Sequence, residues 1–140
     1  MAKRIIFWRH GQTDYNVQGR VQGQVDIPLN EVGLAQAEAA AEELAKLKPD
    51  LIISSDLRRA QATAQVLQGK CGEGVQLLKD DRLRERAFGD FEGLSVKELK
   101  TRFAGRYEEW RGTGESPLAG VESRGKVGTR VAQCVTEHFE

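Results

Sequence analysis

The residues best suited to chemistry stand together near the N-terminus, as Arg9, His10 and Gly11. Arginine carries a permanent charge and a fork of N–H donors that matches phosphate or carboxylate. Histidine offers a ring nitrogen that can act as a base or a nucleophile. Glycine lets the backbone turn sharply or approach a ligand closely. The triplet therefore predicts an anion site, and we interpret it as a phosphate site.

A second group lies at residues 54–60, where Arg58 and Arg59 fall in the expected first turn of a helix. The helix macrodipole disfavours cations there by about 0.3–1 kcal/mol each. A bound phosphate would reverse this argument, because helix N-termini bind anions. Alternatively, Asp56 could offset the charge, or one arginine could simply be solvated. The pattern favours a functional role for at least one of the two.

A third group, residues 83–93, places Glu85 and other charged residues among Phe88 and Phe91. Such a loop could carry a carboxylate into a site. It could equally be a solvated surface loop that its two phenylalanines anchor to the core. The segment by itself leaves both interpretations open.

The elements that must position these groups alternate between strand and helix. Short apolar runs predict strands at residues 4–8, 51–53 and 75–78. Apolar spacing predicts a helix at 31–47 with Asn30 as N-cap, and another from Ser55 or Asp56 to about residue 68. This order implies parallel strands with right-handed crossovers, in which ligands bind beyond the carboxyl ends of the strands.

The rest of the chain predicts less regular structure. Loops are expected at residues 10–29 and 79–93, and Ser95 with Glu98 predicts a capping box that starts a short helix. Residues 104–120 predict a loop around a turn at 107–110, followed by a last helix near residues 127–134. The whole chain, residues 1–140, is expected to form one α/β domain.

Composition excludes several functional classes. The chain has 21 Lys and Arg against 21 Asp and Glu, so no basic field points to nucleic acid or a membrane surface. No apolar run approaches the ~20 residues of a membrane-spanning helix, and residues 1–10 do not resemble a signal peptide. Cys71 and Cys134 lack metal or disulfide spacing. We therefore predict a cytoplasmic protein without nucleic-acid or membrane partners.

Taken together, three ordered motifs resemble those of the histidine phosphatase (phosphoglycerate mutase-like) superfamily. They are Arg9-His10-Gly11, Ser55-x-Leu57-x-Arg59-Ala60-x-x-Thr63-Ala64 and Leu83-x-Glu85-x-x-Phe88-Gly89-x-Phe91-Glu92-Gly93. Residues 12–17 and 22–24 are similar to the small-molecule phosphatase branch, of the glucosyl-3-phosphoglycerate phosphatase type. The resemblance covers residues 4 to about 132 and implies a mostly parallel sheet flanked by helices in three layers.

The resemblance also implies roles for individual residues. His10 would attack phosphorus to form a phosphohistidine, and Glu85 would protonate the leaving oxygen and then activate water. The phosphate would be bound by Arg9, Asn16, Gln22 and Arg59. A backbone carbonyl would fix the His10 tautomer, and the arginines would keep its ring neutral. The arginines would supply the positive charge, so neither a metal nor another cofactor is expected, and no cluster of metal ligands is apparent in the sequence. The substrate would be a small phosphorylated metabolite.

One part of the family pattern is missing. The family uses a second histidine, in a His-Gly pair at the end of a later strand. The only other histidine here is His138, which we expect to lie on the surface of the last helix or to be partly buried. We therefore expect the domain to be incomplete at its C-terminus. The absent strand would lie beside the first strand, and the exposed edge would favour a homo-oligomer or strand exchange.

Three hypotheses follow from the sequence. The first, which we favour, is a phosphomonoesterase that hydrolyses a small phosphorylated metabolite. The second is phosphoryl transfer of the phosphoglycerate mutase type, although mutases of the family usually carry Glu-Ser after the glycine, where this chain has Gln12 and Thr13. The third is a non-catalytic fragment or phosphate-binding module that lacks the second histidine.

Overall fold

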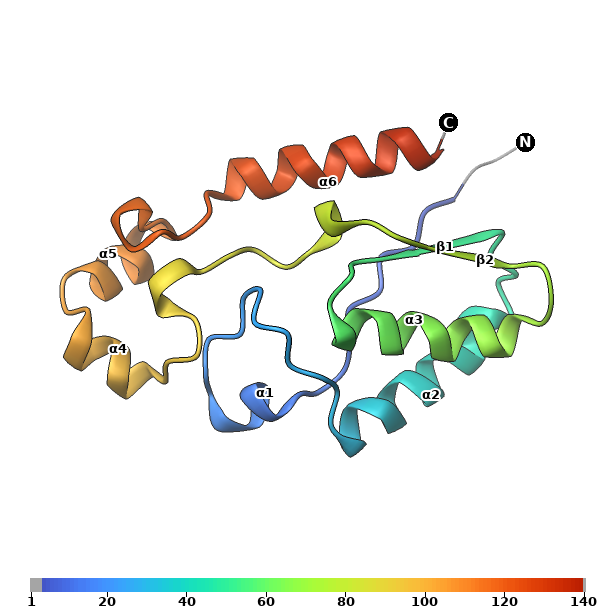
Figure 1. The fold of residues 1–140 in the computed structure, drawn as a ribbon, viewed down its shortest axis with the longest axis horizontal. Coiled ribbons are helices and arrows are strands. Elements are labelled where there is room, and N and C mark those ends of the chain that lie inside the picture. Colours follow the sequence, from blue (N-terminus) through green and yellow to red (C-terminus); the bar gives the residue numbers. More distant parts are fainter. Residues whose placement is uncertain (1–3, 140) are drawn as a thin grey trace.

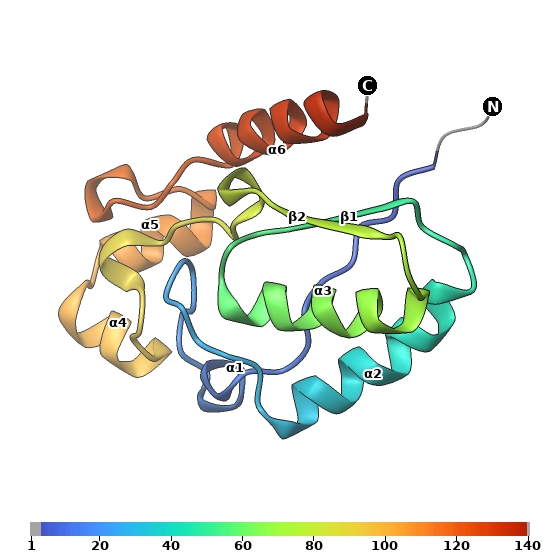
Figure 2. The same cartoon turned by 45° about the vertical axis from the view of Figure 1, so that its right-hand side comes forward.

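The centre of the fold is a two-stranded parallel sheet, in a computed structural model that describes residues 4–139. Strands β1 (Leu51–Ser54) and β2 (Gln76–Lys79) pair in the register Leu51 to Gln76. Helix α3 (Arg58–Cys71) connects them, and α2 (Glu31–Ala45) packs against α3. Helix α6 (Arg124–Phe139) lies on the opposite side of the sheet from α2 and α3 (Figures 1 and 2). The predicted α/β class, with a parallel sheet flanked by helices, is confirmed.

Sequence periodicity located these central elements well. Asn30 caps α2 by accepting a hydrogen bond from the N–H of Gly33 at 2.9 Å, and both strands start within one residue of the predicted positions. The core of this layer consists of Ala41, Ile52, Ala64 and Leu67, with Leu44, Leu77 and Trp8 packed around it. Both helices bury alanines, Ala37 and Ala41 on α2 and Ala64 on α3.

The predicted cap of α3 was wrong. The N-cap residue is Leu57, which makes no side-chain cap bond, instead of Ser55 or Asp56. Ser55 accepts a hydrogen bond from the N–H of Leu57 at 3.3 Å, and the Asp56 carboxylate binds the guanidinium of Arg84. Both candidate caps thus lie one or two residues before the observed N-cap, and α3 begins at Arg58.

The predicted buried strand at residues 4–8 is also wrong. This segment has no strand assignment, and Phe7 is 75% exposed, with Ile5 and Ile6 more than 40% exposed. Only Trp8 packs against the core of the sheet. Among residues 4–139 no strand pairs with this segment, and an apolar run without a pairing partner remains an extended stretch (Figure 1).

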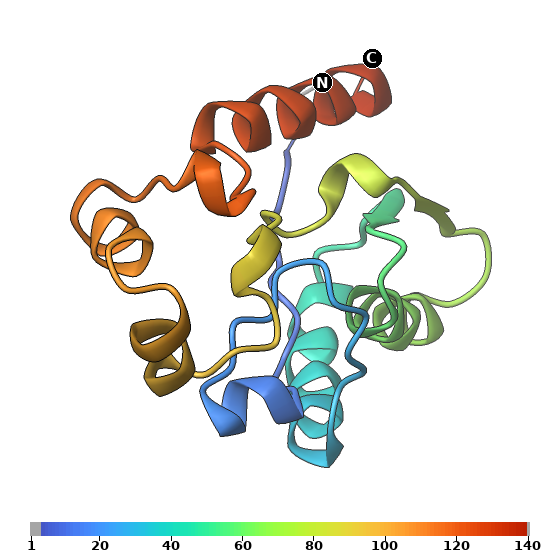
Figure 3. The same ribbon diagram turned by 60° about the vertical axis from the view of Figure 1, so that its left-hand side comes forward.

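A second core holds the other half of the molecule together. It comprises Phe91, Leu99, Tyr107, Ala119 and Val121, with Trp110 packed against Phe91 at a ring-centroid distance of 5.3 Å. The helices around it are η2 (Gly89–Phe91), α4 (Val96–Arg102), α5 (Arg106–Thr113) and η3 (Pro117–Ala119). Figure 3 shows α4 and α5 well separated from α2 and α3, with the N-terminal segment running between them.

All three predicted loops contain helices, and residues 79–93 hold the short 3-10 helices η1 (Asp81–Leu83) and η2. Residues 104–120 hold α5 and η3, because the aromatic contacts of Tyr107 and Trp110 anchor a segment whose composition favours a loop. Residues 10–29 hold α1 (Asp14–Gln18), which a capping box between Thr13 and Asn16 starts. The predicted capping box at Ser95 and Glu98 is confirmed at the start of α4. No helix within residues 4–139 is long and apolar enough to cross a membrane.

Candidate active site

His10 lies half-buried in the loop that leads into α1, and its ring orientation is fixed. Its Nδ1 atom is 2.7 Å from the carbonyl oxygen of Gly11. Because a carbonyl oxygen only accepts hydrogen bonds, Nδ1 must carry the proton in this contact. In the neutral ring, the lone pair then resides on Nε2, the atom that could attack phosphorus. The expected hydrogen bond from His10 to a backbone carbonyl is present.

The loop that carries His10, residues 9–16, is fixed against the start of α2. Gln12 donates its N–H to Oε1 of Gln36 at 2.9 Å and accepts a hydrogen bond from the N–H of Asn30 at 3.1 Å. A Cβ atom on Gly11 would lie 2.7 Å from the carbonyl oxygen of Gly33. Gly11 is therefore required for close packing on α2, whereas the sequence had suggested a sharp turn or an approach to a ligand.

Arg59 lies in the first turn of α3 and is almost completely buried, with 1% of its side chain exposed. It donates to the carbonyl oxygens of Gly23 and Val25, and to Oε2 of Glu85 at 3.2 Å. Three of its five N–H groups are thus engaged by described residues. Its neighbour Arg58 is exposed and pairs with Asp26. Local sequence physics left the two arginines equivalent and the family motif favoured Arg59; in the structure Arg59 is the buried one of the two.

Glu85 reaches Arg59 from the loop between η1 (Asp81–Leu83) and η2. Its side chain is 33% exposed, so the carboxylate contacts the buried guanidinium and also solvent. A carboxyl group that borders both a phosphate-binding cation and solvent can exchange a proton with a leaving group or with water. The loop is therefore more than the solvated surface segment that its sequence also allowed.

Electrostatics connect His10 to these residues. The pKa of His10 is lowered, chiefly because burial disfavours the charged imidazolium. The Gly11 carbonyl opposes this shift, Arg59 and Arg9 lower the pKa further, and Glu85 raises it. The net effect keeps His10 neutral, as a nucleophile requires. Four of the six predicted site residues therefore act on one another.

The other two predicted residues are less directly engaged. Gln22 is buried, accepts a hydrogen bond from Thr13 Oγ1, and precedes Gly23, whose carbonyl oxygen binds Arg59. Asn16 is exposed, and its Oδ1 accepts hydrogen bonds from the N–H and hydroxyl of Thr13. In this structure Asn16 thus completes a helix cap, and its role in phosphate binding stays a prediction.

No sequence motif pointed to Arg130, which holds the loop of Glu85 in place. From α6, Arg130 donates to the carbonyl oxygens of Arg82, Arg84 and Glu85 at 2.6, 2.7 and 3.1 Å. It also forms an ion pair with Glu122 at 2.9 Å. An arginine on an amphipathic helix looks like an ordinary surface residue, so no local signal could have revealed these long-range contacts.

Glu92 was part of a quoted motif, but its role was not foreseen. Its Oε2 accepts hydrogen bonds from the N–H of Phe88 at 2.8 Å and of Gln24 at 3.1 Å. A Cβ atom on Gly23, which has φ +52°, would lie 2.3 Å from Oε2 of Glu92. Glu92 thus joins the two backbone segments that supply carbonyl partners and the carboxylate to Arg59.

Three side chains with potential metal-ligand atoms, which have no ligand spacing in the sequence, come together in the tertiary structure. The donor atoms of Asp80, Cys134 and His138 all lie within 4.8 Å of one another. His138 is indeed partly buried on the last helix, as predicted, and binds Asp80 at 3.0 Å. The spacing along the chain concealed this cluster because Asp80 follows β2, whereas the other two residues lie on α6.

Comparison with known proteins agrees with this geometry. The sequence model of the histidine phosphatase superfamily (branch 1) matches residues 5–140. The chain belongs to the histidine phosphatase superfamily. Over 136 residues it is 46% identical to a glucosyl-3-phosphoglycerate phosphatase of Mycobacterium tuberculosis, covering 97% of this chain and 60% of that protein.

Two further relatives illustrate the similarity to other members of the superfamily. A solved structure of a mycobacterial glucosyl-3-phosphoglycerate phosphatase with VO3 superposes with a TM-score of 0.81 at 46% identity, covering 91% of this chain and 60% of that one. A 2,3-bisphosphoglycerate-dependent phosphoglycerate mutase of Brucella ovis is 34% identical, over 94% of this chain and 66% of that protein. The chain thus spans about 60% of the length of its curated phosphatase relatives.

Proposed function

We propose that this chain is a phosphomonoesterase that hydrolyses a small phosphorylated metabolite through a phosphohistidine on His10. The observation that carries the proposal is the combination of a His10 ring whose Nδ1 is bound to Gly11 with a buried Arg59 that also contacts Glu85. This arrangement supplies a neutral nucleophile, a phosphate-binding cation and a proton donor. The similarity to named phosphatases supports the same conclusion.

In the first step, Nε2 of His10 attacks phosphorus and the bond from phosphorus to the ester oxygen breaks. Glu85, in its protonated form, gives its proton to the departing oxygen. Arg59 and the exposed Arg9 stabilise the charge on the transferring phosphoryl group. Because these arginines supply positive charge, the proposed step requires no metal ion.

In the second step, water attacks the phosphohistidine and the phosphorus–nitrogen bond breaks. Glu85, now a carboxylate, takes the proton from the attacking water, and inorganic phosphate leaves. His10 returns to the neutral form with its proton on Nδ1. The hydrogen bond to Gly11 holds the ring through both steps, so Nε2 alone changes its bonding.

The direct test is phosphate release from p-nitrophenyl phosphate by the 140-residue chain and by its His10→Ala variant. We expect release by the wild type alone. Rapid acid-free quenching, digestion and mass spectrometry should then locate a phosphoryl group on His10. If wild type and variant release equal amounts, the catalytic proposal fails, and phosphate binding measured by calorimetry would then identify a binding module. Label on another residue would refute the nucleophile assignment.

The mutase alternative has a separate test. A mutase would isomerise a phosphoglycerate in the presence of a bisphosphate primer, whereas a phosphatase releases inorganic phosphate. The Mycobacterium tuberculosis glucosyl-3-phosphoglycerate phosphatase shares 46% identity with this chain over 136 residues, against 34% over 135 residues for the Brucella ovis mutase, which favours hydrolysis. Glucosyl-3-phosphoglycerate is accordingly the first substrate to assay, followed by sugar phosphates, phosphoglycerates and nucleotides.

We also propose that residues 4–8 mediate self-association, as a homo-oligomer or by strand exchange. The support is an extended apolar segment that no strand among residues 4–139 covers, with Phe7 75% exposed. Light scattering of the wild type should show a mass above that of a monomer, and Phe7→Lys should lower it. A monomeric mass over a wide concentration range would contradict the proposal. We propose the cytoplasm as the compartment, on composition alone.

A further inference from the structure

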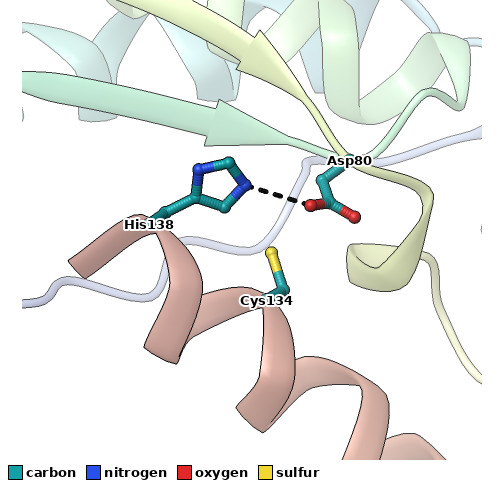
Figure 4. A group of neighbouring side chains, drawn as sticks. All are labelled: Asp80, Cys134 and His138. Carbon is teal, nitrogen blue, oxygen red and sulfur yellow. Dashed lines mark hydrogen bonds and ion pairs between the residues drawn. The ribbon is translucent and has the colours of Figure 1, made fainter. Parts of the chain in front are cut away.

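Three side chains with metal-binding atoms meet where the last turns of α6 approach the end of β2. They are Asp80, Cys134 and His138, and Figure 4 shows the three donor groups pointing toward one another. Their donor atoms all lie within 4.8 Å of one another, and Nε2 of His138 is 3.0 Å from Oδ2 of Asp80. Within residues 4–139 this is the one group of three or more such residues that could hold an ion.

The backbone fixes this geometry on both sides. Cys134 and His138 are four residues apart on α6, so their side chains project from the same face of the helix. Asp80 immediately follows β2, and its N–H donates to the carbonyl oxygen of Ser54 at 2.8 Å, which continues the pairing of the strands. Helix α6 also contacts η1, the turn that Asp80 caps.

We propose that Asp80, Cys134 and His138 form a Zn²⁺ site, with water as the fourth ligand. One sulfur, one imidazole nitrogen and one carboxylate oxygen are the donors that zinc accepts in tetrahedral sites. Calcium and magnesium take oxygen ligands and would not select a thiol or an imidazole. The proposed site belongs to α6 and the end of β2, and none of its ligands is among the residues proposed to act in catalysis.

Of the two carboxylate oxygens of Asp80, Oδ2 is the one that faces another candidate ligand, His138. Oδ1 accepts hydrogen bonds from the backbone N–H and from Nε of Arg82, both at 3.0 Å, and these bonds orient the carboxylate as outer-sphere partners orient metal ligands. Nη2 of Arg82, which contacts Oδ2 at 2.7 Å, is also 2.7 Å from Oε2 of Glu137. Zinc could therefore replace one Arg82 contact without leaving that guanidinium unpaired.

Binding must also displace a proton from sulfur. Burial and the neighbouring Asp80 raise the pKa of Cys134 to about 11, while Arg82 opposes the shift and Glu137 adds to it. Near neutral pH, Zn²⁺ therefore forms a Zn–S bond as the S–H bond breaks and the proton passes to buffer. A transition metal can make this exchange because thiolate binds it strongly, and the proton released is a measurable product.

The chain offers a matched control for two of the ligands, because it contains only two cysteines and two histidines. We suggest titrating Zn²⁺ into the chelator-treated 140-residue chain by calorimetry. Cys134→Ala, His138→Gln and Asp80→Asn should each weaken binding by more than about 100-fold, beyond the 10–100-fold typical of losing an outer-sphere partner. Cys71→Ala and His10→Ala should bind as wild type does, with one ion per chain. Equal binding by a ligand variant and its control, or no stoichiometric binding by wild type, would overturn the site.

A second readout begins with alkylation of the wild-type protein, which does not depend on how the variants fold. Zn²⁺ should slow alkylation of Cys134 by at least about 10-fold, but not that of Cys71, as mapped by peptide mass spectrometry. Co²⁺ in place of Zn²⁺ should show a thiolate charge-transfer band that disappears in Cys134→Ala and persists in Cys71→Ala. Equal protection of both cysteines, or a Co²⁺ spectrum without that band, would refute ligation by Cys134.

Discussion

The two loops that meet at the candidate active site are held in different ways. The nucleophile loop, residues 9–16, is fixed by neighbours in sequence and by the start of α2, through the contact of His10 with Gly11 and the bonds of Gln12 to α2. The acid loop, residues 80–92, is fixed by residues that are distant in sequence, among them Arg130, which lies 45 residues beyond Glu85 on α6.

In one loop the residues that carry the reactive groups also hold them in place, whereas in the other loop these two tasks belong to different parts of the chain. The nucleophile loop combines both in a short stretch, so its function can be recognised locally. The acid loop supplies Glu85, but residues of α6 and residues 20–25 determine where that carboxylate lies. Damage to the nucleophile loop should therefore remove chemistry, whereas damage to α6 should misplace an otherwise intact acid. Four predictions test this contrast, in decreasing order of expected effect.

The largest effect is expected from His10→Ala. Removing the nucleophile of a group of residues that act as a unit costs on the order of 10⁶-fold in kcat, so phosphate release should fall to background. The urea midpoint should change little, since the loop keeps its bonds to α2. Steady-state assays with unfolding curves check both parts. Substantial residual turnover would mean that His10 is not the nucleophile.

Glu85→Gln should lower kcat by about 10²–10⁴-fold, the usual contribution of a general acid. The loss should be smaller for p-nitrophenyl phosphate than for an alkyl phosphate, because p-nitrophenolate leaves without needing a proton. Phosphate binding should persist, since Arg59 keeps its bonds to Gly23 and Val25. An equal loss with both substrates would assign Glu85 a role other than protonation of the leaving group.

Arg130→Gln should lower kcat by up to about 10²-fold, the scale of a small misplacement of a catalytic group, with KM nearly unchanged. It should also destabilise the chain by about 3 kcal/mol, because Glu122, only 14% exposed, loses its partner. Adding Glu122→Gln should recover much of the stability but little of the rate, since the bonds to the acid loop stay lost. Full recovery of both would leave Arg130 with a purely structural role.

The smallest effect concerns the pH dependence of the nucleophile loop. Because the folded pKa of His10 lies below 6.5, the acid limb of kcat/KM should lie below pH 6.5. Between the folded pKa and 6.5 the unfolded chain binds more protons, so the unfolding free energy should fall as pH decreases through this window. Arg9→Gln removes one cause of the shift and should move the acid limb upward, by less than about one pH unit. A shift of the acid limb to lower pH in Arg9→Gln would contradict the assignment of this limb to His10.

The same contrast explains which elements could be predicted from the sequence. Periodicity and capping located α2, β1 and β2, because their signals lie within a few residues. These local signals failed to predict α5, because Tyr107 and Trp110 become helical through contacts with a distant aromatic core. They failed again at residues 4–8, where an apolar run predicts burial but cannot specify the strand that would provide it.

Residue types and motif order predicted a nucleophile, a phosphate-binding arginine and an acid at His10, Arg59 and Glu85. Their chemistry is intrinsic to the side chains, and their spacing is a property of the chain. Only the tertiary structure decided that Arg59 and not Arg58 is buried beside Glu85, that Arg130 positions the acid loop, and that Cys134 and His138 meet Asp80. Each of these depends on contacts between elements that are distant in sequence, and local propensities do not encode such contacts.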